Sequence, residues 1–227
     1  MGVDALKFFI MMLAMALPAY LLGSVNGAII TSKYLYRKDI RKYGSGNPGL
    51  TNFYRVFGKV GALLVVAIDV LKTVGPVIFG GWLFWRYMGM PVNAGWAFRH
   101  FFEVSLFGQA LAGFFIMLGH CFPVFYNFKG GKGVLAAGVI IFFLDWRLAL
   151  IAWGTFVIIT ASTRYVSLGA MAGGAMIPVS MLLLKVGGIR EFIAMTMCAL
   201  LLIARHQPNM IRLARGEESK FSFKRAK

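Results

Sequence analysis

Acidic residues are the scarcest feature of this 227-residue sequence, which has 8 Asp and Glu against 24 Lys and Arg and a formal net charge of +16. Charged residues of both signs make up only 14% of the chain, compared with about 25% in ordinary soluble domains. Hydrophobic residues make up 59%. A soluble fold of this size would leave much of that apolar surface in water, so the composition excludes a soluble globular protein and indicates an integral membrane protein.

Cysteine is also rare, since the chain has 2, Cys121 and Cys198. They lie far apart in apolar surroundings. The sequence has no Cys-x-x-Cys pair, no Cys/His spacing typical of a metal site, no carboxylate pair and no GxxxxGK(S/T) phosphate loop. We therefore predict free buried thiols and no metal site.

Long hydrophobic runs predict an all-α integral membrane protein, because a spanning helix needs roughly 20 apolar residues. The first run continues past Ala16 to Ile30, and Asp4 and Lys7 do not form a clearly positive segment before it, so we expect an uncleaved span rather than a signal peptide. No internal repeat stands out, and residues 1–227 read as a single polytopic membrane domain. Polar or charged breaks separate seven predicted transmembrane helices, at 8–31, 60–85, 104–118, 133–144, 148–162, 168–186 and 191–204.

The positive charges are segregated by these spans. Loops 32–59, 119–132, 163–167 and 205–227 carry 17 of the 24 Lys and Arg residues. Because cytoplasmic loops are enriched in Lys and Arg, we predict these loops to be cytoplasmic, the N-terminus outside and 205–227 a basic cytoplasmic tail. Residues 86–103 form the longest outside loop. Topology thus explains most of the positive charge, and no nucleic acid partner is needed.

The first predicted cytoplasmic loop, Tyr43 to Asn52 followed by Arg55, is rich in glycine and small polar residues. Successive backbone N–H groups in such a loop can turn toward one point and bind a phosphate, and Arg55 can add a bidentate contact. A flexible polar linker is the alternative. The candidate residues are Gly44, Ser45, Gly46, Asn47, Gly49, Thr51 and Asn52.

The second loop runs from Gly119 to Gly133 and interleaves glycines with two lysines just before a predicted helix. A helix N-terminus favours anions, and lysine supplies a mobile positive charge. The alternatives are a helix boundary with flanking lysines and, for His120, a structural histidine. The candidates are His120, Lys129, Gly130, Gly131, Lys132 and Gly133.

A third polar group is split between the turn Arg164–Ser167 and the segment after the last span. His206 and Asn209 are three apart, so they share a face if that segment is helical, and a histidine there can accept a proton near neutral pH. The alternative is a juxtamembrane amphipathic segment that holds anionic lipid. Within the second span, Asp69 and Lys72 are ionisable residues on one helix face, which suggests a structural pair or a role near the site.

Together the loops supply phosphate-binding backbone, cations, hydroxyls and a histidine, which suit transfer chemistry on phosphorylated substrates at a membrane surface. A transporter or translocator of phosphorylated solutes or lipids is the main alternative, although such folds often show internal repeats. A basic lipid-binding scaffold would leave the two glycine-rich loops unexplained.

These motifs closely resemble those of the bacterial membrane glycerol-3-phosphate acyltransferases that use acyl phosphate, the PlsY family. The family patterns are GSGNxGxTN followed by Arg, GHxxPVFxxFKGGKG, RYVSL with RHxxNIxRLxxGxE, YLLGS and LDVLK. The resemblance covers residues 19–218, and the matching segments are Gly44–Asn52 with Arg55, Gly119–Gly133, Arg164–Leu168, Arg205–Glu218, Tyr20–Ser24 and Ile68–Lys72.

Departures from the family patterns are small. Leu50 stands where the family usually has Ala, and Met210 where it has Ile. Residues 135–137, Leu-Ala-Ala, replace a stretch that commonly contains Thr, and the outside loop 86–103 is longer than usual. No polar motif residue assigned to the chemistry is missing.

The resemblance implies that the protein transfers a fatty acyl group from acyl phosphate to the 1-hydroxyl of sn-glycerol 3-phosphate. The products are lysophosphatidate and inorganic phosphate, in the first step of phospholipid synthesis. It also implies a seven-span protein of the bacterial inner membrane with the motifs at the cytoplasmic side. Acyl-CoA and acyl carrier protein are not expected as donors, no cofactor or metal is expected, and we expect a monomer among membrane lipids.

The resemblance implies the following roles for these residues. We expect Ser45, Arg55, Lys132, His206 and Asn209 to be catalytic. The base is His206 or a substrate phosphate oxygen, and direct attack is favoured over an acyl-enzyme because no nucleophile–base pair is identifiable. The residues expected to bind substrate or phosphate are Gly44, Gly46, Asn47, Gly49, Thr51, Asn52, His120, Lys129, Gly130, Gly131, Gly133, Ser167 and Glu218, with Asp69, Lys72 and Arg164 in support.

Overall fold

A computed structural model of the chain describes residues 5–88 and 105–221, and within these ranges the regular elements are α-helices and short 3-10 turns. The all-helical prediction is confirmed. Most of the predicted outside loop 86–103 and the last residues of the basic tail, 222–227, lie outside the described residues. The elements are α1 (Ala5–Gly23), α2 (Gly27–Tyr36), η1 (Ile40–Lys42), α3 (Leu50–Phe57), α4 (Lys59–Met88), α5 (Leu106–Cys121), η2 (Val124–Tyr126), α6 (Val134–Leu144), α7 (Trp146–Thr163), α8 (Val166–Leu184), α9 (Ile189–Arg205) and α10 (Gln207–Ala214).

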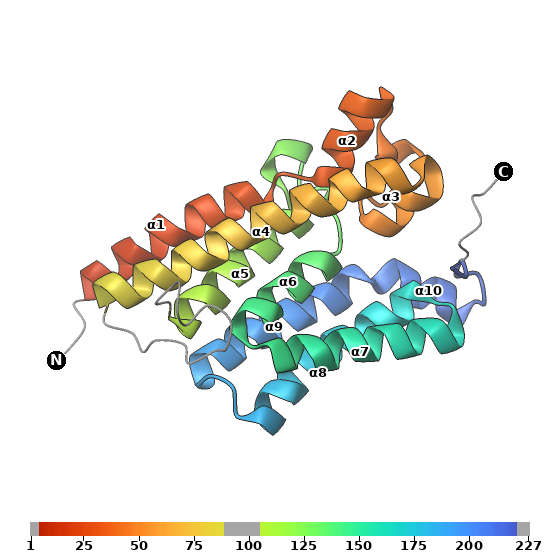
Figure 1. Cartoon of the computed structure of the whole chain (residues 1–227). Helices are drawn as coiled ribbons and strands as arrows, with labels where there is room; N and C mark the ends of the chain where they lie inside the picture. Colours follow the sequence, from red (N-terminus) through yellow and green to blue (C-terminus); the bar gives the residue numbers. More distant parts are fainter. Residues whose placement is uncertain (1–4, 89–104, 222–227) are drawn as a thin grey trace.

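The long helices form two groups that lie side by side, α1, α4 and α5 in one and α6 to α9 in the other (Figure 1). Their facing sides share one apolar core, which includes Met15, Ile116, Ile140 and Leu148. Helices α2, α3 and α10 gather at one end of the bundle, which we call the polar end (Figure 1).

Glycines allow the helices to approach closely. A Cβ added at Gly23 would lie 2.5 Å from the backbone oxygen of Ile116 in α5, and one at Gly173 would lie 2.7 Å from that of Ala152 in α7. Both glycines belong to the GxxxG spacings of the sequence. Small residues at these spacings pack backbone against backbone, as is common between membrane helices.

The predicted first span, 8–31, is not one continuous helix. Helix α1 ends at Gly23 and α2 begins at Gly27, where the Asn26 side chain accepts a hydrogen bond from the N–H of Ile29 at 2.9 Å. An asparagine that caps a new helix offers the backbone an alternative to continuing the old one. The break lies beside α4, whose Lys72 donates a hydrogen bond to the carbonyl of Val25.

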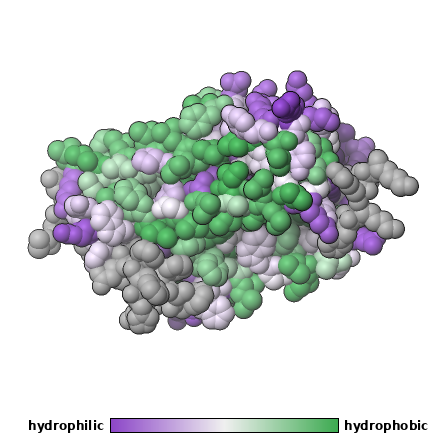
Figure 2. Space-filling view, turned by 45° about the horizontal axis from the view of Figure 1, so that its top comes forward, coloured by the Kyte–Doolittle hydropathy of each residue, from purple (hydrophilic) through white to green (hydrophobic). Residues whose placement is uncertain are grey.

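Five segments are long and apolar enough to cross a membrane: Ala5–Tyr36, Lys59–Tyr87, Leu106–Tyr126, Trp146–Thr163 and Val166–Leu184. The predicted spans 133–144 and 191–204 correspond to α6 and α9, which are shorter, with 11 and 17 residues. Helix α6 ends because Asp145 caps the start of α7, accepting a hydrogen bond from the N–H of Arg147 at 2.9 Å. Hydrophobic residues cover much of the surface along the helices, and hydrophilic residues gather toward the ends (Figure 2).

The prediction of a loop from Tyr43 to Asn52 is wrong for its last part, because α3 begins at Leu50. Phe53 is fully buried in a small second core with Ile29 and Ile40, and burial of this side chain holds the amphipathic α3 against α2 and α4. Thr51, Asn52 and Arg55 therefore project from a helix rather than from a flexible loop.

Candidate functional site

A cavity of about 270 Å³ opens at the polar end and is lined by residues from all three predicted polar loops. It collects residues that are far apart in sequence, from the loop before α3, from α3 to α8, from α10 and from the segment after α10. The predicted site residues that line it are Ser45, Asn47, Gly49, Thr51, Asn52, Arg55, Asp69, His120, Lys132, Gly133, Ser167, His206, Asn209 and Glu218.

The first loop is held by two asparagines. Asn52 accepts a hydrogen bond from the N–H of Ser45 at 2.9 Å and donates to the carbonyls of Tyr43 and Asn47 at 3.0 and 3.1 Å. Asn26, at the helix break, donates to the carbonyl of Pro48 at 3.1 Å. These bonds make residues 43–49 a defined loop rather than a linker.

Glycine is required at position 44 of this loop. Its φ is 58°, a left-handed conformation that glycine adopts without strain, and an added Cβ would lie against the Oδ1 atom of Asn52. Gly44 therefore supports the loop from outside the cavity.

Three helices point their N-termini at the cavity: α3, α6 and α8. Their N-cap residues are Gly49, Gly133 and Tyr165, and none of them makes a side-chain capping hydrogen bond. By contrast, side chains cap α2, α5 and α7 at Asn26, Ser105 and Asp145. Free N–H groups and the positive ends of three helix dipoles thus face one space, which favours anions.

Glu218 anchors the third polar group. Its carboxylate accepts hydrogen bonds from Ser167 Oγ at 2.7 Å and Asn209 Nδ2 at 2.6 Å, and forms an ion pair with Arg212 Nε at 2.7 Å. Burial alone would raise the pKa of Glu218, but these three donors outweigh it and hold that pKa below its usual range. The carboxylate therefore stays ionised and fixes the orientation of Ser167 and Asn209.

Lys132 joins the second loop to the third group, because its Nζ donates to Oδ1 of Asn209 at 2.5 Å. Burial lowers the pKa of Lys132 to about 8; Glu218 opposes this shift, whereas Arg212, Arg205 and Arg55 add to it. A cation crowded by other cations and only partly solvated binds an incoming anion strongly.

His206 lies at the junction of α9 and α10 and is 3% exposed. Its Nδ1 lies 2.8 Å from the carbonyl oxygen of Leu202, and since a carbonyl can only accept, Nδ1 carries the proton. Burial lowers the pKa of His206 to about 4, although this hydrogen bond opposes the shift. At neutral pH the ring is uncharged and its Nε2 is a proton acceptor.

The second loop is fixed by Arg205, which donates to the carbonyls of Gly130 and Gly131 at 3.1 and 3.2 Å. Gly131 packs against the ring of His120, where an added Cβ would clash with Nε2. His120 is also within 3.0 Å of Lys72, which forms an ion pair of 2.8 Å with Asp69.

Several predicted residues lie outside this cavity. Gly46, Lys129 and Gly130 line a wider cationic depression at the mouth, together with Arg41 and Arg205. Arg164 ends α7 in a left-handed conformation with its side chain exposed, and its carbonyl accepts a hydrogen bond from the N–H of Phe221 at 2.7 Å.

The sequence reasoning missed Arg212 and Ser219 as cavity residues. Arg212 lines the cavity and pairs with Glu218, and Ser219 receives a hydrogen bond on its carbonyl from Arg55 at 3.3 Å. The spacing of Arg212 three residues after Asn209 was a usable signal, since both then lie on one face of a helix. Ser219 carried no signal, because its contact is made through the backbone.

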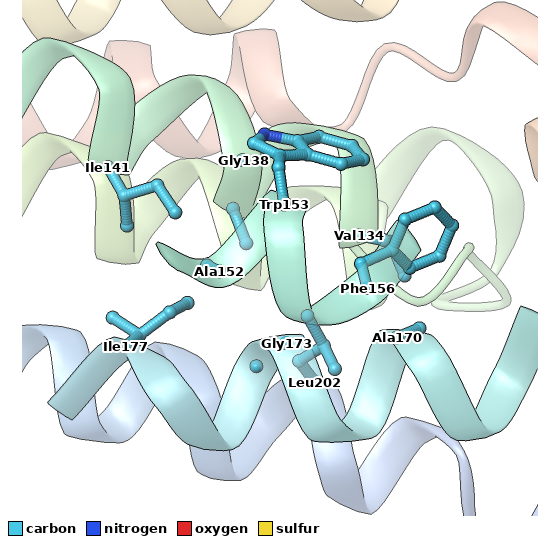
Figure 3. A pocket seen from close by; sticks show the side chains of 12 residues that line it. Val134, Gly138, Ile141, Ala152, Trp153, Phe156, Ala170, Gly173, Ile177 and Leu202 are labelled. Atoms are coloured by element: carbon cyan, nitrogen blue, oxygen red, sulfur yellow. The ribbon is translucent and has the colours of Figure 1, made fainter. Parts of the chain in front are cut away.

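An apolar pocket adjoins the polar cavity between α6, α7, α8 and α9 (Figure 3). Val134, Trp153, Phe156 and Ala170 line both spaces, so the two adjoin at these residues. Trp153 lies over Gly138, where an added Cβ would come within 2.2 Å of the indole. The remaining apolar lining is Ala137, Ile141, Ala152, Gly173, Gly174, Ile177 and Leu202.

Cys121 and Cys198 are free and buried, as predicted. In the part of the chain that the structure describes, there is no group of three or more His, Cys, Asp or Glu side chains that could hold a metal ion.

Comparison with known proteins gives consistent matches over nearly the whole chain. The family described as glycerol-3-phosphate acyltransferase matches residues 13–216. The glycerol-3-phosphate acyltransferase of Dechloromonas aromatica is 38% identical over 216 residues, covering 95% of this chain and 99% of the relative. That of Idiomarina loihiensis is 35% identical over 213 residues, covering 94% and 97%.

Solved structures agree with the sequence matches. The crystal structure of PlsY, an integral membrane glycerol 3-phosphate acyltransferase, in its glycerol 3-phosphate form has a TM-score of 0.77 and 30% identity, covering 93% of this chain and 96% of that one. Its lysophosphatidic acid form has a TM-score of 0.76 and 28% identity, with the same coverage.

Proposed function

The chain belongs to the glycerol-3-phosphate acyltransferase family, and we propose that it transfers a fatty acyl group from acyl phosphate to the 1-hydroxyl of sn-glycerol 3-phosphate. It is a membrane acyltransferase that forms lysophosphatidate, which is the first acylation of phospholipid synthesis. The similar PlsY structures hold glycerol 3-phosphate in one form and lysophosphatidic acid in the other, which supports that substrate and product.

Acyl phosphate is the donor we propose, rather than acyl-CoA or acyl carrier protein. It is a mixed anhydride whose phosphate is a good leaving group, so the enzyme mainly positions the reactants. Two phosphorylated substrates in one site require many donors. The three uncapped helix N-termini, together with Lys132 and Arg55, supply them without a metal ion or cofactor.

The two phosphates are divided between the two sides of the cavity in our proposal. The acyl phosphate head lies near the loop Gly44–Gly49, with Ser45 and Asn47. Glycerol 3-phosphate is held by Lys132, Arg55 and Ser167, while His206 and Asn209 orient its hydroxyl. This arrangement places each dianion against its own helix N-termini and separates the two negative charges.

The hydroxyl attacks the acyl carbonyl directly, and phosphate leaves. Its proton passes to Nε2 of His206, or to an oxygen of the departing phosphate. Ser167 is a poor candidate for an acyl-enzyme because its hydroxyl donates to Glu218, whose lowered pKa makes that carboxylate a weak base. The acyl tail lies between the spans and leaves the polar cavity along the apolar residues beside Trp153, which line both spaces.

The observation that carries this function is the shared lining of two unlike spaces. A polar cavity with cations and free helix N-termini adjoins an apolar pocket, which matches a substrate with a phosphate head and a hydrocarbon tail. A transporter for small phosphorylated solutes would have no need of the apolar pocket, and a translocator of phosphorylated lipids would bind substrate without forming a product.

For the topology we propose seven spans, with α6 and α9 as the two short ones. The N-terminus lies outside, and the C-terminal tail 205–227 and the polar end lie in the cytoplasm. The segregation of Lys and Arg supports this orientation. We propose a monomer with a single membrane domain, located in the bacterial inner membrane.

The purified protein in lipid nanodiscs, given palmitoyl phosphate and labelled glycerol 3-phosphate, should form lysophosphatidate and release one phosphate per product. Parallel reactions with palmitoyl-CoA and palmitoyl acyl carrier protein should form none. Product from either of those donors would overturn the proposed donor, and substrate binding without product from any donor would overturn the transferase.

A further inference from the structure

Lys72 of α4 has a complete set of hydrogen-bond partners deep in the bundle, where its side chain is 3% exposed. Its ammonium donates to Oδ1 of Asp69 at 2.8 Å, to the carbonyl of Val25 at 2.5 Å and to Nδ1 of His120 at 3.0 Å. An ammonium has three N–H donors and no acceptor, so each donor has one partner. A charge inside a membrane domain is costly unless it is satisfied in this way.

The break between α1 and α2 provides part of this coordination. The carbonyl of Val25 is available because the helix is interrupted there, and the first N–H of α2, at Gly27, donates to Oδ1 of Asp69 at 3.3 Å. The Asp69–Lys72 pair thus stabilises both sides of the break. The third donor of Lys72 is directed at a residue of the candidate site.

The contact with Lys72 determines which nitrogen of His120 carries its proton. Because an ammonium cannot accept a hydrogen bond, Nδ1 must accept, and the ring proton is on Nε2. His120 is 5% exposed and lines the polar cavity with Ser45 and Lys132. Within residues 5–88 and 105–221, the structure records no hydrogen bond at its Nε2.

Gly131 leaves the Nε2 edge of the His120 ring uncovered. A Cβ at this position would lie 2.3 Å from Nε2 of His120, so any other residue would displace the ring or block the nitrogen. Gly131 is not among the residues with positive φ, and therefore its backbone conformation does not require glycine. The requirement at this position is space beside a buried N–H group.

We propose that His120 donates its Nε2–H to a phosphate oxygen of a substrate in the cavity, and that Lys72 is the positioning residue that holds His120 in this tautomer. The inference rests on the proposed function, since the ligand is one of its two phosphorylated substrates. It gives the two histidines of the cavity opposite tasks. His206 donates through Nδ1 to Leu202 and keeps Nε2 as an acceptor, whereas His120 accepts at Nδ1 and donates at Nε2.

The variants His120→Gln and His120→Asn separate this role from a structural one. A glutamine amide nitrogen reaches the position of Nε2, whereas an asparagine side chain reaches only that of Nδ1, where its oxygen can accept from Lys72. We expect His120→Asn to be the more stable variant and His120→Gln the more active one. The loss of kcat/KM in His120→Asn should be about 10- to 100-fold, as for a hydrogen bond to a charged group.

If His120 served only to satisfy Lys72, activity would follow stability and His120→Asn would be the better enzyme, which would overturn the proposal. Gly131→Ala gives a second test, because the added methyl group blocks Nε2 or displaces the ring while the His120 side chain itself is retained. It should raise KM for a phosphorylated substrate. The unfolding temperature, measured alongside, shows whether the variant is folded. Wild-type KM in a folded Gly131→Ala protein would also contradict the proposal.

The tautomer itself can be measured by ¹⁵N NMR of histidine-labelled protein in nanodiscs, without any assay of activity. The wild type should show His120 protonated at Nε2. The double variant Asp69→Asn/Lys72→Met, which leaves no unpaired charge, should show a mixture of tautomers and a raised KM. Lys59→Met, which removes an exposed lysine from the same helix, is the control and should change neither.

Protonation of wild-type His120 at Nδ1 would overturn the inference while leaving the transferase untouched. If the wild type formed no lysophosphatidate, the proposed function would fail, and the NMR measurement would still decide the role of Lys72.

Discussion

Lys132 and Asn209 are joined by a hydrogen bond of 2.5 Å between Nζ and Oδ1, across 77 positions of sequence. Through Asn209 the lysine is connected to Glu218, and through Glu218 to Ser167 and Arg212. This chain of contacts ties the N-terminus of α6 to those of α8 and α10. The cation is therefore held in place before substrate arrives, which lowers the cost of binding an anion.

Lys132→Ala should lower kcat/KM by about 100-fold or more, because it removes a preorganised charge that holds the phosphate of glycerol 3-phosphate. The variant should still insert and purify as a folded protein, since Lys132 is not part of the apolar core. Initial rates with saturating acyl phosphate and varied glycerol 3-phosphate test this. Lys59→Ala, which removes an exposed lysine from the start of α4, serves as the control.

The affinity for glycerol 3-phosphate should fall as the pH rises through about 8. The pKa of Lys132 is lowered to about 8 in the free enzyme, so its positive charge is present below that pH and lost above it. The substrate phosphate is already a dianion above about pH 7 and does not mask the effect. Calorimetric titrations between pH 7 and 10 measure it, and constant affinity over this range would contradict the assignment of Lys132.

His206→Asn should separate folding from chemistry. The asparagine amide can donate to the carbonyl of Leu202 as Nδ1 does, but it offers no acceptor at the position of Nε2. We expect an unfolding temperature close to wild type and a loss of about 100-fold in kcat, within the range of general base catalysis. Near-normal turnover would assign the proton to a phosphate oxygen of the substrate.

The wild-type pH profile gives a second measure of His206. The ring must be neutral to accept a proton, so its contribution is retained as the pH falls to about 4 and is lost below that pKa. If activity instead fell near pH 6.5 because a group of the enzyme becomes protonated there, the pKa of the histidine would be the ordinary one and its ring would not be buried.

Glu218→Gln should weaken binding of glycerol 3-phosphate and lower stability together. The carboxylate organises Ser167, Asn209 and Arg212, and an amide can accept from only some of these donors. The pKa of Glu218 is depressed in the folded state, so its stabilising effect is present above the unfolded pKa and lost as the pH falls through the folded one. The unfolding temperatures of wild type and variant should therefore converge in acid.

Glu217→Gln is the matched control for this prediction. Glu217 is the exposed neighbour of Glu218 and does not line the cavity. It should retain wild-type KM and stability, and an equal effect of the two substitutions would argue against a specific role for Glu218.

Gly138→Ala should shift the acyl-chain preference toward shorter chains. The added Cβ would lie 2.2 Å from the indole of Trp153, so the ring must move into the apolar pocket. Relative rates with acyl phosphates of 10 to about 18 carbons test this. Gly154→Ala is the control, because a Cβ there meets nothing within 4 Å, and an unchanged preference in both variants would place the tail elsewhere.

The membrane character, the helical class and the chemistry-bearing segments could be read from the sequence. Each depends on local composition: apolar runs for the helices, and glycine with Lys or Arg where a helix begins. These local signals identified the right segments, and most of the predicted site residues from Ser45 to Glu218 do line the cavity. The extent of α3 was missed because Phe53, which holds it in place, is buried by partners in α2 and η1.

Only the packing of the chain decided how these segments act together. His120 meets Lys72 at a separation of 48 positions, and Ser167 meets Glu218 at 51, and no local pattern indicates such pairs. The neighbour of each side chain in the fold determines where its proton lies. Lys72 leaves Nε2 of His120 as a donor, whereas the carbonyl of Leu202 leaves Nε2 of His206 as an acceptor. Arg164 and Lys129, which carry the same motif signals, lie outside the cavity because the turns that hold them face outward.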